Sequence, residues 1–86
     1  MSVRAELEAF ILEDIALGRE MESIDPDEDL LARGVIDSLA VTQLVAFLEE
    51  RYSVRVTDDE LIPDNFRSLA RMEAFVERKR PRAPTW

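Results

Sequence analysis

The chain has 86 residues, of which 47% are hydrophobic and 35% charged, and its formal net charge is −8. This length is that of one small domain, and an acidic chain is poorly suited to binding the phosphate backbone of nucleic acids. No window approaches the roughly 18 consecutive apolar residues of a membrane span, and the first six residues are too acidic for a signal peptide. We therefore expect a cytoplasmic monomer that binds neither nucleic acid nor membrane.

Two residue types are missing, and their absence narrows the chemistry. The sequence contains no histidine and no cysteine. It therefore lacks the usual general base at neutral pH, a thiol nucleophile, the soft metal ligands and any disulfide. We expect no catalytic activity of its own and no metal site.

Charge is distributed unevenly along the chain. Residues 1–77 carry seven Lys and Arg against nineteen Asp and Glu, a net charge of −12, and the last four cations all follow residue 77. The acidic body favours partner proteins with basic surfaces. Pro81 and Pro84 interrupt any helix at the C-terminus, so we expect residues 80–86 to form a flexible basic tail.

Hydrophobic periodicity predicts a first helix that is capped by Ser2 and reaches about Leu17. Its apolar face comprises Val3, Leu7, Phe10, Ile11 and Ile15.

A long acidic connection follows, over residues 19–37, and we expect its apolar residues to pack against the helices. Residues 25–29 resemble the start of an EF-hand loop, but Leu30 and Ile36 stand where that loop requires glycine and glutamate. We interpret the run as a solvated acidic loop.

A second helix is predicted from Ser38 to about Tyr52. Its apolar face comprises Val41, Leu44, Val45, Leu48 and Tyr52, and the opposite face comprises Leu39, Thr42, Gln43, Ala46, Glu49 and Glu50. Neighbouring acids on a helix point about 100° apart, so Glu49 and Glu50 are surface charges rather than a catalytic pair.

The remaining elements complete an all-α fold. Residues 54–56 are an extended connector, and Thr57 with Glu60 forms a capping-box pattern that opens a short helix closed by Pro63. Asn65 is the expected cap of a last helix from Phe66 to about Lys79. The prediction is a small four-helix bundle with three longer helices, one short helix and a long loop between the first and second.

The stretch with the clearest chemical meaning is residues 34–39, G-V-I-D-S-L. Gly34 frees the backbone, Asp37 caps the second helix, and Ser38 lies in its first turn. The unpaired N–H groups and the positive dipole end at that position favour a phosphate attached to Ser38. With no neighbouring base, Ser38 is either an acceptor for a group that another enzyme transfers or simply a helix-starting serine.

This hexapeptide resembles the phosphopantetheine attachment motif of acyl and peptidyl carrier proteins. Residues 29–31 (D-L-L) in the acidic loop and residues 63–69 (P-D-N-F-R-S-L) follow the order of that family. The resemblance covers about residues 3–79 and implies a carrier domain over residues 1–79. It also implies that Ser38 carries a 4′-phosphopantetheine arm from coenzyme A, and that Asp37 helps to position the transferase chemistry. The thiol of this arm would carry an acyl or aminoacyl group as a thioester.

The resemblance further implies a docking surface and a set of partners. The docking residues would be Asp37, Leu39, Thr42, Gln43, Ala46, Glu49 and Glu50. The partners would be a phosphopantetheinyl transferase, an adenylating enzyme that loads the acyl or aminoacyl group, and downstream ketosynthase, condensation or tailoring enzymes.

Two departures from the family pattern narrow the role. Ala40 and Gln43 stand where carriers of primary fatty-acid synthesis usually have acids, and the turn before Asp37 is one residue longer than a Gly-X-Asp turn. These features resemble free-standing carriers of specialised pathways for polyketides, nonribosomal peptides or related products. Acyl and aminoacyl cargo both remain open. An unmodified acidic helical adaptor for basic partners is the alternative of another class, and a hydrolase built on carboxylates alone is a third.

Overall fold

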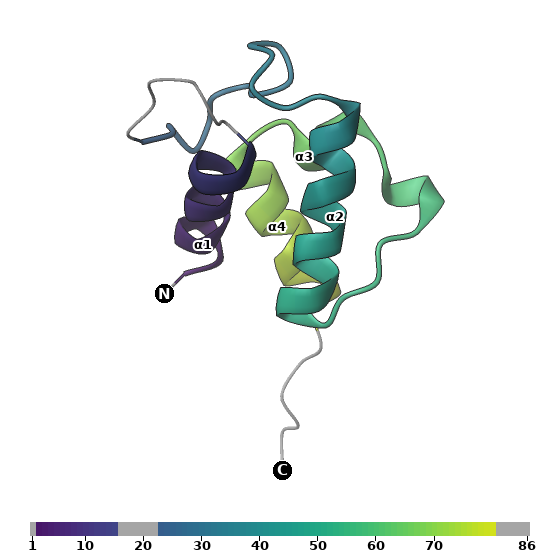
Figure 1. Cartoon of the computed structure of the whole chain (residues 1–86). Coiled ribbons are helices and arrows are strands. Elements are labelled where there is room, and N and C mark those ends of the chain that lie inside the picture. The colour runs from purple at the N-terminus through teal and green to yellow at the C-terminus, as the bar shows by residue number, and fades with distance from the viewer. Residues whose placement is uncertain (1, 16–22, 81–86) are drawn as a thin grey trace.

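The computed structural model describes residues 2–15 and 23–80, and these form a bundle of helices (Figure 1). The elements in chain order are α1 (Val3–Phe10), which continues as the π-helical segment η1 (Ile11–Ile15), then α2 (Ser38–Tyr52), the 3-10 helix η2 (Asp58–Glu60), α3 (Pro63–Phe66) and α4 (Leu69–Lys79). No strand occurs within these described ranges. The prediction of a small all-α fold is confirmed.

Each longer helix starts at a side-chain cap. Ser2 Oγ accepts from Ala5 N at 3.1 Å, and Asp37 Oδ1 accepts from Ala40 N at 2.9 Å. These caps satisfy amides that have no partner inside the helix. The bounds of α2 are those expected from the sequence.

The last helix starts later than predicted. Ser68, not Asn65, caps it, because Ser68 Oγ accepts from Arg71 N at 3.2 Å and α4 begins at Leu69. The expected short helix is in fact two pieces, η2 and α3, and Pro63 opens the second piece instead of ending the first. A proline fits the first helical position because its missing N–H would be unpaired there in any case.

Two predictions extend into residues outside the described ranges. The end of the first helix near Leu17 lies there, and so does most of the expected tail. Arg80, the first tail residue, is described: its N–H donates to Val76 O at 2.7 Å, and its guanidinium lies 5.4 Å from the centre of the Tyr52 ring.

One apolar core joins the helices with the long connection. Ile24, Leu30, Val35 and Ile36 from the connection are buried, as expected from the sequence. They pack with buried residues of all the α-helices: Val3, Leu7, Ala40, Leu44, Leu48, Tyr52, Phe66, Leu69, Met72, Phe75 and Val76.

Backbone hydrogen bonds attach the connection to the rest of the fold. Leu30 N donates to Arg67 O at 2.6 Å, and Ala70 N donates to Pro26 O at 2.9 Å. The Glu8 side chain on α1 accepts from Ile24 N at 2.7 Å. The connection is therefore held to both α1 and the junction of α3 with α4.

Polar contacts between α1 and the end of α2 centre on Glu6. Its carboxylate accepts from the Tyr52 hydroxyl and from the Arg51 guanidinium. The Tyr52 hydroxyl and then Arg51 lower the pKa of Glu6, whereas burial and then the Glu6 carboxylate raise the pKa of Tyr52. Next to this cluster, the rings of Phe10 and Phe47 stack with centroids 4.3 Å apart.

The lowered pKa of Glu6 predicts a loss of stability in acid. Ionised Glu6 stabilises the folded state above its ordinary pKa of 4.5, and this contribution is lost as the pH falls below 4.5 through the folded-state pKa. We expect Glu6→Gln to lower the melting temperature at pH 7 and to flatten the decline of stability as the pH falls below 4.5. Circular dichroism melts measure both effects. The exposed Glu13 provides the control, and an equal effect of Glu13→Gln would contradict the assignment.

Candidate attachment site at the start of α2

The chain that leads into α2 is fixed around Leu30. Leu30 is fully buried, and its carbonyl accepts from Val35 N at 3.0 Å and from Ile36 N at 3.3 Å. Gly34 has a φ of 74°, a left-handed conformation that glycine adopts without steric cost. The tight turn places buried Val35 and Ile36 directly before the helix. The position at which α2 starts is therefore set by the core.

Ser38 is the first residue of α2 and is exposed to solvent. Asp37 precedes it in an extended conformation and caps the helix through Ala40 N. The first amides and the positive end of the dipole of a 15-residue helix thus lie next to the Ser38 hydroxyl. A phosphate ester on this hydroxyl would be electrostatically favoured.

An apolar groove of about 400 Å³ begins at Ser38. One side is formed by α2 and the other by residues 61–66, which follow η2 and include α3. Its lining comprises Leu31, Ser38, Val41, Thr42, Val45, Leu61, Ile62, Pro63 and Phe66. No charged side chain lines it, so the groove suits an apolar group tethered at Ser38.

Sequence reasoning missed the far side of this groove. Leu61 and Ile62 were assigned only to a short helix, yet they are 45% and 46% exposed and line the groove. The available signal was an apolar pair that follows three acids and belongs to no helical stripe. Such a pair directly before a proline is a candidate surface contact.

The structure distributes the predicted docking residues over different parts of α2. Thr42 lies beside Ser38 in the groove, and its hydroxyl donates to Ser38 O at 3.2 Å. Leu39 is 69% exposed, as helical spacing predicted. A separate hollow towards α1 is lined by Gln43, Ala46 and Glu50, together with Phe10, Asp14 and Phe47.

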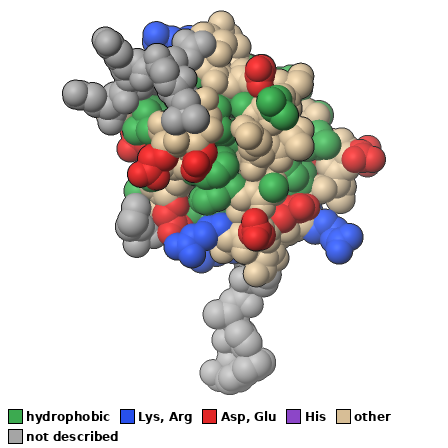
Figure 2. All heavy atoms as spheres, in the orientation of Figure 1, with side chains coloured by type: hydrophobic (Ala, Val, Ile, Leu, Met, Phe, Trp, Pro, Cys, Tyr) green, Lys and Arg blue, Asp and Glu red, His purple; other side chains and the backbone are tan. Residues whose placement is uncertain are grey.

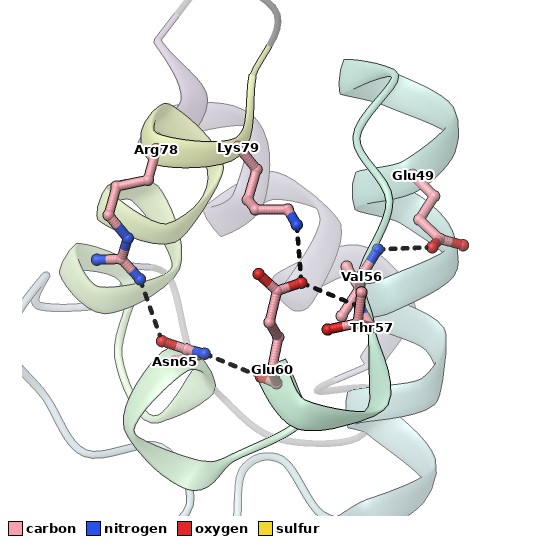
Figure 3. Close-up of polar contacts among 7 residues, drawn as sticks. All are labelled: Glu49, Val56, Thr57, Glu60, Asn65, Arg78 and Lys79. Atoms are coloured by element: carbon pink, nitrogen blue, oxygen red, sulfur yellow. Dashed lines mark hydrogen bonds and ion pairs between the residues drawn. The ribbon is translucent and has the colours of Figure 1, made fainter.

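Glu49 differs from these exposed residues. It is half-buried, and its Oε2 accepts from Val56 N at 2.9 Å (Figure 3). This hydrogen bond joins the connector after α2 (residues 54–56) to the helix. The sequence did not indicate this role of Glu49. On the face of the molecule drawn in Figure 2, carboxylates lie around apolar side chains.

The described residues hold neither a metal-binding cluster nor a helix able to span a membrane. They contain no group of three or more His, Cys, Asp or Glu side chains arranged to hold a metal ion. None of the described helices is long and apolar enough to cross a membrane.

Comparison with known proteins identifies the family of this chain. A family model described as the phosphopantetheine attachment site matches residues 16–76. The probable acyl carrier protein PigG of Serratia sp. (strain ATCC 39006) is 32% identical over 75 residues, which are 84% of this chain and 86% of that protein. A chain in a crystal structure titled as an FAD-dependent dehydrogenase superposes with a TM-score of 0.72 at 28% identity, covering 81% of this chain and 97% of that chain.

The chain belongs to the phosphopantetheine-binding carrier proteins, because the family match spans most of its length. Its prosthetic group is a covalently attached 4′-phosphopantetheine, and the protein is a carrier rather than a catalyst. Carriers of this family interact with phosphopantetheinyl transferases and with biosynthetic enzymes.

The cap at Asp37 gives a prediction about stability. Asp37→Ala should lower the free energy of unfolding by about 1 kcal/mol because the Ala40 amide loses its acceptor. Asp37→Asn should retain most of that stability, since the asparagine oxygen can also cap. Chemical denaturation measures both values. Ser38→Ala is the control and should leave stability nearly unchanged, whereas a loss as large as that of Asp37→Ala would contradict the assigned cap.

Proposed function

We propose that Ser38 is the residue that carries the 4′-phosphopantetheine arm, and that the protein is a free-standing carrier of acyl or aminoacyl thioesters. The observation that carries this proposal is the exposed hydroxyl on the first residue of α2, next to an apolar groove. When bound, the arm supplies the thiol that the cysteine-free chain lacks.

The residues around Ser38 support the attachment in distinct ways. Asp37 fixes the start of α2, so that the Cα–Cβ bond of Ser38 has a defined direction. The helix N-terminus stabilises the negative charge of a phosphodiester at that hydroxyl. In the transfer, the Ser38 oxygen would bond to the phosphorus of the arm, the adenosine bisphosphate of coenzyme A would leave, and the serine proton would pass to a base. The chain offers no histidine for that role.

The groove supports cargo with apolar character. Its lining from Val41, Val45, Leu61, Ile62 and Phe66 provides apolar surface within reach of Ser38. Burying apolar atoms there contributes about 25 cal/mol per Å². An acyl group or an uncharged aminoacyl side chain fits this surface better than a charged group does.

We further propose a specialised biosynthetic pathway in the cytoplasm. Ala40 and Gln43 stand where primary fatty-acid carriers usually have acids, and in this fold Ala40 is buried whereas Gln43 is exposed and uncharged. Proposed partners are a phosphopantetheinyl transferase, an adenylating enzyme that loads the cargo, and ketosynthase, condensation or tailoring enzymes.

The structural comparison supports a proposal for one tailoring partner. The matched chain is about as short as this one, since 97% of it aligns with 81% of these 86 residues, and its crystal structure is titled as an FAD-dependent dehydrogenase. We propose that an FAD-dependent dehydrogenase acts on cargo held by this carrier.

Attachment at Ser38 predicts a defined change in mass. Incubation with coenzyme A and a promiscuous phosphopantetheinyl transferase should add one phosphopantetheine group to the protein, as measured by intact mass spectrometry. Ser38→Ala should gain nothing while its circular dichroism spectrum stays that of the parent. An unmodified parent protein with a folded spectrum would contradict the proposal.

Glu50 and Glu49 provide a matched pair for testing the docking surface. Glu50→Ala should lower the kcat/KM of transferase loading by about threefold at low ionic strength, because an exposed acid speeds encounter with a basic partner. The melting temperature should not change, and the rate effect should shrink in high salt.

Glu49→Ala removes the same charge from the adjacent position. It should instead lower the melting temperature, because Val56 N loses its acceptor. Equal loss of stability in both variants, or no loading effect of Glu50→Ala at low salt, would contradict this division of roles.

A further inference from the structure

The wall of the groove opposite α2 is held only weakly by apolar burial. It is lined by Leu61 and Ile62, which directly follow η2, and by Pro63 and Phe66 of α3. Leu61 and Ile62 face the groove with nearly half of their surface exposed, and buried Phe66 anchors only the far end. Apolar contacts alone therefore leave the position of residues 58–62 weakly fixed.

A polar contact from α4 holds Glu60, the residue just before this wall (Figure 3). Lys79 Nζ lies 2.9 Å from Glu60 Oε1, and the same oxygen accepts from Thr57 N at 3.0 Å. Both charged side chains are 27% exposed. The Thr57 amide and then Lys79 lower the pKa of Glu60. The carboxylate is thus ionised at neutral pH and shared between η2 and the last turn of α4.

A second contact secures the end of the exposed stretch. Asn65 Nδ2 donates to Glu60 O at 2.9 Å, and Asn65 Oδ1 accepts from Arg78 Nη2 at 3.4 Å. Leu61 and Ile62 therefore lie between two residues that are both held by the final turn of α4 (Figure 3).

We infer that the last turn of α4 holds the wall of the groove beside Ser38 in position, and that Lys79 is a positioning residue for this wall. Lys79 does not line the groove and acts through Glu60, whose neighbours Leu61 and Ile62 do line it. The identity of the group that enters the groove rests on the proposed function, but the attachment of the wall is a property of the unmodified chain.

Amide hydrogen exchange by NMR on the unmodified protein tests this inference. The reporters are the amides of Glu60, Leu61 and Asn65, which donate to Thr57 O, Asp58 O and Ile62 O. The amides of Leu44 and Leu48 inside α2 report on opening of the whole fold. Failure of Ser38 to accept an arm would leave this test unaffected.

Lys79→Met should speed exchange of the three wall amides about fivefold, the size expected for loss of a partly exposed ion pair, with the α2 amides within about twofold of the parent. Lys79→Arg should restore slow exchange because arginine can still contact Glu60. Arg71→Met removes a cation from the exposed face of the same helix and should change neither set. Unchanged wall exchange in Lys79→Met, or equal acceleration in α2, would overturn the inference.

Discussion

The backbone of Leu30 is the constraint on which the site depends. The buried side chain fixes this residue in the core, its N–H donates to Arg67 O, and its carbonyl accepts from two amides just before α2. A long acidic loop is thereby tied at one point to the α3–α4 junction and to the start of α2. The core therefore fixes the backbone position of Ser38, although the Ser38 side chain is exposed to solvent.

Where local signals agreed with one another, the sequence was sufficient to predict the structure. Asp37 as a cap, the helical stripe after it and the apolar residues of the loop indicated the observed α2 and most of its buried face. Ala40 is buried as well, whereas Val41 and Val45 are only partly buried and line the groove. The capping box of Thr57 and Glu60 is observed as predicted. The start of α4 was mispredicted, because Asn65 and Ser68 are both good caps and only tertiary contacts choose between them. Asn65 is instead occupied by Glu60 O and Arg78, a choice that periodicity cannot reveal.

The groove shows a similar limit. Ser38 and the exposed face of α2 were evident from motif and spacing, whereas Leu61 and Ile62 became site residues only once α4 had brought their segment opposite α2. Two adjacent acids that appear equivalent in the sequence also have different environments in the fold. The Glu49 carboxylate accepts a hydrogen bond from a backbone amide, whereas Glu50 is exposed. The carrier thus combines a site fixed by its core with an acidic surface suited to brief encounters.

The most direct test of the central claim is to locate the prosthetic group on the chain. After loading from coenzyme A, proteolysis and tandem mass spectrometry should find phosphopantetheine on the peptide that contains Ser38, with fragment ions that place it on that serine. Phosphopantetheine found on Ser53 or Ser68 instead, or on no peptide of a folded sample, would contradict the account.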